Sequence, residues 1–280
     1  VQMAKGNFAP VPVSVGDLFA GALLPGLLLV SLYLFWVLFK AVTDPASCPA
    51  TPVPPEEKGD LLKEVLVALV PPLLLILAVL GSILGGIATP TEAASVGAVG
   101  AMVLAALRWR LSFGILKETV IATATITSMV FVILLGASVF SVVFRMMGGD
   151  NLVHEFLSNL PGGPMAAVAM VMLIMFFLGF ILDTFEIIFI VIPITAPVLL
   201  ALDVDPVWLG VLVGVNLQTS FLTPPFGFAL FYLRGVAPAG LPTSAIYKGI
   251  LPFVMLQIVA IAILFLFPEI VTWLPRLVAG

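Results

Sequence analysis

Uninterrupted apolar runs of about 20 residues recur along nearly the whole of this sequence. A helix of about that length is needed to cross a hydrocarbon core about 30 Å thick. Charged residues make up only 9% of the 280 residues, whereas soluble domains carry roughly 25%. So few charges cannot cover a surface that faces water. The chain is therefore predicted to be an all-α polytopic membrane protein whose partner is the lipid bilayer.

Six apolar runs are predicted to cross the membrane: residues 18–39, 61–85, 92–107, 116–146, 207–233 and 247–267. The fourth run is too long for an upright helix, so it is expected to tilt or to bend near Gly136. The proline-rich, charged segment 43–60 is expected to lie in water. Thr89 or Thr91 is expected to cap the third crossing. Glu92 is assigned to the same cap in preference to a transport role.

Residues 165–202 form two apolar arms of about 16–18 residues on either side of Asp183-Thr184-Phe185-Glu186. Each arm is short for a full crossing. Two structures fit: two short spanning helices with the acids in an aqueous turn, or a re-entrant hairpin with an acidic tip at mid-membrane depth. We favour the hairpin, because two full crossings would leave the acids in a short cytoplasmic turn without a basic residue. Acids at membrane depth are costly and mark ion or proton sites.

Basic residues are distributed unequally between the two sides that the hairpin arrangement predicts. Cytoplasmic loops carry the excess of lysine and arginine. Lys58 and Arg108 are therefore predicted to be cytoplasmic, and His154 and the C-terminus at Gly280 periplasmic. The two sets compared are Lys40, Lys58, Lys63, Arg108, Arg110, Lys117, Arg234 and Lys248 against Lys5, Arg145 and Arg276.

A polar stretch interrupts the fifth crossing. Its members are Asn216, Gln218, Thr219, Ser220 and Thr223, followed by Pro224 and Pro225. The two prolines remove two amide donors and leave carbonyls unpaired one turn earlier. These carbonyls, with the Ser220 and Thr223 hydroxyls, suit a small cation, and a half-helix beginning near Phe226 suits an anion. A broken helix opposite a hairpin tip is typical of secondary transporters. The alternative is a proline kink that only bends a packed helix.

Other kinds of chemistry find little support in the sequence. A single cysteine, Cys48, and a single histidine, His154, exclude a disulfide and a metal site built from these residues within the chain. No phosphate-binding loop, dinucleotide fingerprint or zinc-protease motif occurs. The net charge of -4 and the lack of a basic run argue against a nucleic-acid partner. An enzyme is therefore not expected.

Two motifs resemble those of one transporter family: GGIATPTEAA at residues 85–94 and NLQTSFLTPPFG at residues 216–227. They are similar to the large membrane subunit of tripartite ATP-independent periplasmic (TRAP) transporters, and the resemblance covers essentially the whole chain. It implies a sodium-coupled elevator-type transporter built from two inverted repeats, each with a hairpin and a broken helix. Residues 183–186 would then be the second hairpin tip. Because the family subunit is longer, the chain is expected to be its C-terminal half.

The resemblance also implies the domains, partners and site residues. Residues 1–16 would follow the missing first repeat, 17–164 would form mainly scaffold helices, 165–235 the transport hairpin and broken helix, and 236–280 a C-terminal membrane helix. The expected partners are the N-terminal half of the subunit, a small membrane subunit and a periplasmic solute-binding protein, in the bacterial inner membrane. The cargo would be a small organic acid, with Na⁺ as coupling ion and no other cofactor. An ion channel, another ion-coupled exchanger or a structural membrane subunit are the alternatives. The candidate sodium ligands are Gln218, Thr219, Ser220, Thr223, Asp183 and Glu186, and the candidate substrate contacts are Asn216, Pro224, Pro225, Phe226 and Thr184.

Overall fold

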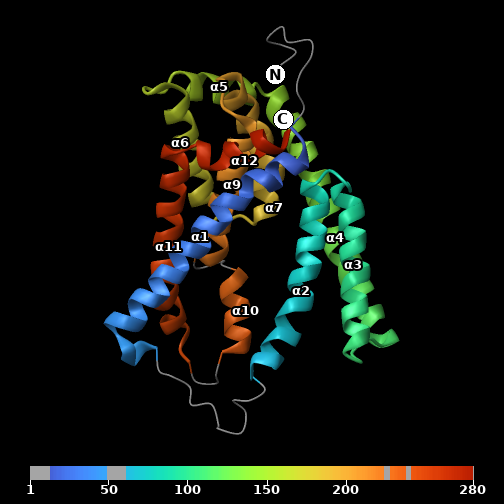
Figure 1. Ribbon diagram of the computed structural model, residues 1–280. Helices are drawn as coiled ribbons and strands as arrows, with labels where there is room; N and C mark the ends of the chain where they lie inside the picture. Colours follow the sequence, from blue (N-terminus) through green and yellow to red (C-terminus); the bar gives the residue numbers. More distant parts are fainter. Residues whose placement is uncertain (1–12, 49–60, 224–227, 238–240, 280) are drawn as a thin grey trace.

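The computed structural model describes residues 13–48, 61–223, 228–237 and 241–279, and within these ranges every regular element is a helix (Figure 1). This confirms the prediction of an all-α polytopic membrane protein. The elements, in chain order, are α1 (Val15–Thr43), the 3₁₀ turn η2 (Pro45–Ser47), α2 (Leu61–Leu84), α3 (Pro90–Leu107), α4 (Phe113–Met146), α5 (Gly149–Ser158), α6 (Gly163–Leu178), α7 (Thr184–Glu186), the π-helix η3 (Ile187–Val191), α8 (Ile192–Ala201), α9 (Pro206–Leu222), α10 (Phe228–Val236), α11 (Thr243–Leu266) and α12 (Glu269–Ala279).

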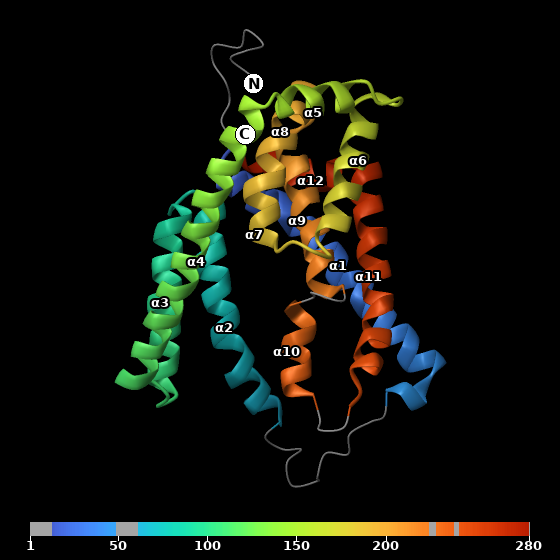
Figure 2. The ribbon, with the colours of Figure 1, turned by 180° about the vertical axis from the view of Figure 1, so that it is seen from behind.

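The hairpin is the part of the fold that departs from simple crossing helices. α6 runs inward from the end of the molecule at which α5 lies, and the α7–η3–α8 arm returns to that same end (Figures 1 and 2). The segment Thr184–Ala201 is apolar and long enough to be one of six candidate spans by composition. Its path makes it a hairpin arm instead. The tip of this hairpin, at α7, lies about midway between the two ends of the molecule (Figures 1 and 2), which favours the re-entrant hairpin over two full crossings.

The fifth crossing is shared by two shorter helices. α9 runs inward from the end with α5, and α10 continues in the same direction to the opposite end (Figure 1). With α1, α2, α3, α4 and α11, this gives the predicted six crossings plus one hairpin in the part of the chain described. Residues 224–227, with Pro224, Pro225 and Phe226, lie outside the described residues.

The structure decides between the two alternatives for the fourth run and adds a helix after the last crossing. α4 is one continuous helix of 34 residues, in which Gly136 causes no break, and it slants across the molecule instead of bending (Figure 2). The last crossing is not the last helix, because α12 follows Pro268 and packs across α1 near Gly21. Glu269 and Arg276 give α12 a polar side, so it lies along one end of the molecule and does not extend α11 (Figure 1).

An arginine at the end of α3 donates hydrogen bonds to carbonyls of α2 that lack an amide donor. Pro71 and Pro72 lie inside α2, and proline deprives the carbonyl four residues earlier of its amide donor. The carbonyls affected are those of Val67 and Ala68. The Nη2 atom of Arg108 donates to both, at 2.9 and 3.4 Å. The guanidinium thus replaces the two missing donors and ties the end of α3 to the middle of the proline-containing helix.

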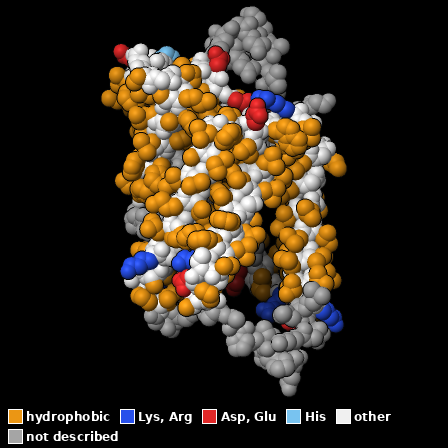
Figure 3. Space-filling view, turned by 60° about the vertical axis from the view of Figure 1, so that its left-hand side comes forward, with side chains coloured by type: hydrophobic (Ala, Val, Ile, Leu, Met, Phe, Trp, Pro, Cys, Tyr) orange, Lys and Arg blue, Asp and Glu red, His pale blue; other side chains and the backbone are white. Residues whose placement is uncertain are grey.

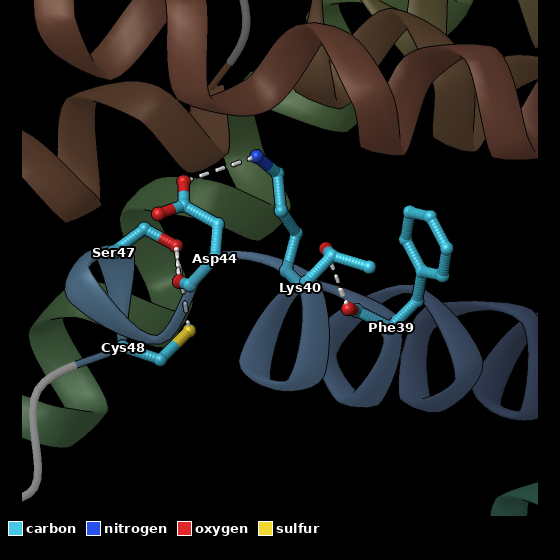
Figure 4. A network of polar contacts seen from close by, with 6 residues as sticks. Phe39, Lys40, Asp44, Ser47 and Cys48 are labelled. Atoms are coloured by element: carbon cyan, nitrogen blue, oxygen red, sulfur yellow. Dashed lines mark hydrogen bonds and ion pairs between the residues drawn. The ribbon is translucent and has the colours of Figure 1, made fainter.

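The C-terminal end of α1 is closed by a small polar network (Figure 4). Lys40 forms an ion pair with Asp44 at 3.5 Å, one turn further along the chain. The Ser47 hydroxyl donates to the Asp44 carbonyl at 2.8 Å and lies 3.9 Å from the Cys48 sulfur. The chain therefore leaves the helix in an ordered turn that keeps Cys48 exposed.

The surface has the pattern expected of a membrane protein. Apolar side chains cover the sides of the molecule, and charged side chains gather toward its two ends (Figure 3). Among the described residues, the end opposite α5 carries seven basic residues and the end with α5 carries two. The seven are Lys40, Lys63, Arg108, Arg110, Lys117, Arg234 and Lys248, and the two are Arg145 and Arg276. By the positive-inside rule, this distribution agrees with the predicted topology, in which the end with α5 and α12 faces away from the cytoplasm.

Candidate functional site

The tip of the hairpin is ordered by its own two acids. The Asp183 carboxylate accepts a hydrogen bond from the Thr184 amide at 2.7 Å, and the Glu186 carboxylate accepts one from the Asp183 amide at 3.2 Å. The Asp183 side chain also accepts from the backbone of Glu186, which completes a capping box at the start of α7. Both acids are half-buried, and α7 lies about midway between the two ends of the molecule (Figures 1 and 2). The acids therefore fix the tip and keep oxygen lone pairs for a further partner.

The hairpin tip meets the end of α9 at an open pocket of about 200 Å³. The tip contributes Asp183, Thr184 and Glu186, and α9 contributes Ser220 and Phe221. Gly179, Ile181 and Leu182 complete the lining. The structure therefore brings together four of the predicted site residues, from two segments separated by more than 30 positions.

Ser220 is the residue of the broken helix that reaches this pocket with an uncommitted polar group. Its side chain is 8% exposed, and its hydroxyl has no hydrogen-bond partner among the described residues. An unpaired buried hydroxyl costs about 1–3 kcal/mol. A ligand that offered a partner to the Ser220 oxygen would recover this free energy.

The two threonines of the break are committed to their own helix. The Thr219 hydroxyl donates to the Val215 carbonyl at 3.2 Å, and the Thr223 hydroxyl donates to the Thr219 carbonyl at 2.7 Å. Their oxygens can still accept or coordinate. Thr219 is fully buried and Thr223 is half-buried at the C-terminal cap of α9, and neither lines the tip pocket.

Asn216 and Gln218 point away from the tip pocket. The Asn216 side chain is 2% exposed and donates to the Met172 carbonyl of α6 at 2.8 Å, so it holds α9 against the first hairpin arm. Gln218 is exposed and lines a groove between α9 and α1. The structure thus separates the predicted polar residues by helix face, with Asn216 toward α6, Gln218 toward α1 and Ser220 toward the hairpin tip.

The pocket has a clear electrostatic preference. Two carboxylates line it, and none of its lining residues is basic. Carboxylate and hydroxyl oxygens are hard ligands that suit a hard cation. The described lining of this pocket therefore favours a cation over an anion.

Glu92 serves a different purpose, as the sequence predicted. Its carboxylate accepts hydrogen bonds from the amide and hydroxyl of Thr89, both at 2.8 Å, and the Glu92 amide donates to the Thr89 hydroxyl at 3.4 Å. This completes a capping box at the start of α3. The prediction that Thr89 and Glu92 form a cap is confirmed.

Sequence reasoning missed Gly179. A Cβ atom at this position would overlap the Ser220 hydroxyl and lie 2.7 Å from the Ser220 Cβ. The hairpin tip can approach α9 this closely because residue 179 has no side chain. The available signal was a glycine a few residues before an acidic turn, and it did not reveal which helix the glycine faces.

Comparison with known proteins places the chain among transporters. A family model described as "Tripartite ATP-independent periplasmic transporter, DctM component" matches residues 7–270. A sialic acid TRAP transporter large permease of Vibrio cholerae is 29% identical over 277 residues, covering 95% of the chain and 61% of that protein. A C4-dicarboxylate TRAP transporter large permease of Pseudomonas aeruginosa is 30% identical over 270 residues, covering 96% and 61%. An ectoine TRAP transporter large permease of Halomonas elongata is 28% identical over 268 residues, covering 93% and 60%. The chain therefore spans about 60% of the length of these relatives.

Proposed function

The chain belongs to the DctM component family of tripartite ATP-independent periplasmic transporters, and from this premise we propose that it is part of the large permease of a sodium-coupled importer of small organic acids. The family's members named above are permeases, and the chain is a transporter component and not an enzyme. Its cargo would be handed over by a periplasmic solute-binding protein, at the inner membrane of a bacterium. The remaining part of the large permease and a small membrane subunit would complete the complex.

The meeting of hairpin tip and broken helix is the observation that supports this function best. Asp183, Thr184, Glu186 and Ser220 line one pocket about midway along the molecule. In secondary transporters, coupling ions and substrate bind where interrupted helices expose backbone and polar groups at membrane depth. We propose that Na⁺ binds here, with the Thr219 and Thr223 oxygens and the carbonyls freed at the break as further candidate ligands.

The substrate class follows from charge and from the relatives. The permeases compared above are named for sialic acid, C4-dicarboxylate and ectoine, and the first two are organic acids. Two carboxylates in the pocket would repel an anion, so a bound cation has to neutralise them before an acid can approach. In our proposal the acid lies beside the ion near Thr184, toward the start of the half-helix at Phe226, which offers backbone amides.

The movement that we propose is of the elevator type. The hairpin, α9 and α10 would move as one body, in agreement with the Asn216 bond from α9 to α6. α2, α3 and α4 would form the scaffold, which α4 connects to the hairpin by packing against η3 and α7.

The test is sodium-dependent uptake by the complete complex, reconstituted in liposomes with its solute-binding protein. Labelled C4-dicarboxylate and sialic acid are offered with a sodium gradient, and choline replaces sodium in the control. Ser220→Ala and Thr223→Ala should raise the sodium concentration for half-maximal uptake by about 2- to 13-fold, since one neutral ligand contributes about 0.5–1.5 kcal/mol. Ser138→Ala, which removes an exposed hydroxyl bonded within α4, should have no effect.

Three outcomes would contradict parts of this proposal. If both hydroxyl variants keep the parental half-saturation and Pro224→Ala transports normally, the break is only a kink. Uptake that needs no binding protein would favour a channel or another exchanger. A complex that shows neither a sodium effect nor docking of a binding protein would make the chain a structural membrane subunit.

A further inference from the structure

Trp109, in the turn between α3 and α4, has a backbone conformation that is unusual for a large residue. Its φ angle is 55°, in the left-handed region that glycine adopts readily and most other residues avoid. The Trp109 amide donates to the Ala106 carbonyl, and the Arg110 amide donates to the Ala105 carbonyl, both at 2.9 Å. This pair of hydrogen bonds is the Schellman motif at the end of α3, whose left-handed position is usually a glycine. A tryptophan thus occupies a position at which glycine would be less strained.

No packing within the described chain compensates for this strain. The Trp109 side chain is 96% exposed, and Phe113, the first residue of α4, is 82% exposed. A strained backbone conformation persists where a surrounding contact or a function requires it. The partner of the Trp109 indole therefore has to come from outside the described residues.

The same turn presents positive charge without an acidic partner. The Arg110 and Lys117 side chains are exposed, and neither forms an ion pair within the part of the chain that the structure describes. Basic residues outnumber acids at this end of α2, α3 and α4: Lys63, Arg108, Arg110 and Lys117 against Glu64 and Glu118. The turn therefore favours an anionic partner.

The turn lies where the headgroup layer of a bilayer is expected. It joins two candidate membrane spans at the end of the molecule with the basic excess, level with the C-terminal ends of α1 and α10 (Figures 1 and 2). In both views α3 and α4 form an outer edge of the molecule. Tryptophan is enriched at membrane–water interfaces, where its apolar ring and polar N–H group both find partners.

We propose that the turn between α3 and α4 binds the headgroup of an anionic phospholipid. Arg110 and Lys117 attract the phosphate, while the Trp109 and Phe113 rings enter the boundary between headgroups and acyl chains. The contact of the indole with lipid offsets the strain of its backbone, and it holds the ends of α3 and α4 at a fixed depth in the bilayer. This site does not depend on the proposed function, because it requires only that the chain spans a membrane.

The first test is the thermal unfolding of the complete transporter complex in detergent micelles. Dioleoyl-phosphatidylglycerol should raise the unfolding midpoint, whereas dioleoyl-phosphatidylcholine and inorganic phosphate should not. Arg110→Gln and Lys117→Gln should each increase the phosphatidylglycerol fraction needed for half of this rise by about 5-fold, the factor that one basic residue contributes near an anionic surface. Lys248→Gln removes an exposed charge of α11 at the same end and should leave this fraction unchanged.

Trp109→Gly separates backbone strain from lipid binding. In micelles without phosphatidylglycerol it should raise the unfolding midpoint, because glycine adopts the left-handed conformation without strain. The further rise caused by phosphatidylglycerol should become smaller than in the parent protein, because the indole is missing. A lower midpoint of Trp109→Gly in neutral micelles would show that the indole packs on protein, and it would overturn the proposal.

Photo-crosslinking identifies what covers the turn. p-Benzoylphenylalanine is placed at position 109 of the complete complex, and native membranes are irradiated. A phospholipid adduct on this chain is expected. A crosslink to another part of the transporter, or no adduct at all, overturns the proposal. It is also overturned if phosphatidylglycerol raises the midpoint equally in the parent protein and in the variant with both Arg110→Gln and Lys117→Gln.

Discussion

Gly179 at the end of α6 and Ser220 near the end of α9 are in such close contact that no Cβ atom fits between them: a Cβ built at residue 179 would overlap the Ser220 hydroxyl. Gly179→Ala should therefore push the hairpin tip away from α9 and reduce uptake by the complete complex to near background. Gly136→Ala is the matched control, because a Cβ there meets nothing within 4 Å. Gly179→Ala should also lower the midpoint of thermal unfolding. Adding Ser220→Gly to Gly179→Ala should restore the packing and raise this midpoint. A fully active Gly179→Ala variant would show that the close approach is not needed.

The acids at the hairpin tip can be tested for cation binding without losing the cap. Asn is as good an N-cap as Asp, and Gln can replace Glu in a capping box. Asp183→Asn and Glu186→Gln should therefore keep the tip and remove one charge each. Loss of a charged ligand costs about 1.5–3 kcal/mol, so sodium half-saturation should rise about 10- to 150-fold. Glu92→Gln makes the same change in the capping box of α3 and should leave the sodium dependence unaltered. Equal sodium affinity in all three variants would restrict the tip acids to capping.

The orientation of the chain can be read from its one cysteine. Cys48 is exposed next to Lys40 and Asp44, at the end with the basic excess. A membrane-impermeant maleimide should therefore not label the parent protein in intact cells and should label it after lysis. His154→Cys adds a cysteine on α5, at the opposite end, and should be labelled in intact cells. Labelling of Cys48 from outside would invert the topology.

The contact of Arg108 with α2 predicts a dependence on the two prolines. Arg108→Ala should lower the unfolding midpoint by about 2–4 °C, the effect of about 1 kcal/mol, because two carbonyls lose their donor. In a protein that already carries Pro71→Ala and Pro72→Ala, the same change should have little effect, since the helix then supplies its own amides. An equal loss in both proteins would mean that Arg108 acts through its charge alone.

The lengths of the apolar runs and the polar residues between them were sufficient to predict the crossings and the hairpin. Apolar runs of membrane length predicted the six crossings. The hairpin was favoured because the turn with Asp183 and Glu186 lies between two short arms and carries no basic residue. The Thr89–Glu92 cap was predictable because all of its partners lie within one helical turn. In each case the deciding interaction is either with lipid or with residues close in the chain.

Contacts between helices were not predictable in the same way. Gly179 and Ser220 are 41 positions apart, and Tyr33 of α1 and Gln257 of α11, whose polar groups face each other, are 224 apart, so their proximity depends on how the helices pack. A single tyrosine or glutamine hardly changes the hydropathy of an apolar helix of 24 or 29 residues, and neither was noticed for that reason. Pro71 and Pro72 deprive two carbonyls of α2 of their amide donors. Only the packing of α3 on α2 shows that Arg108 donates to these carbonyls.

Because α4 is long, membrane thickness should affect the proposed transport site. Between Glu118 and Arg145 the helix has 26 residues without a charge, about 39 Å of apolar length against a hydrocarbon core of about 30 Å. A tilt of about 40° matches the two lengths, and a thicker bilayer would reduce it. Because η3 and α7 pack on α4, each change of that angle moves the surface on which the hairpin rests. Lipids of different acyl-chain length should therefore act on this transporter as modulators, through hydrophobic mismatch and without a binding site of their own.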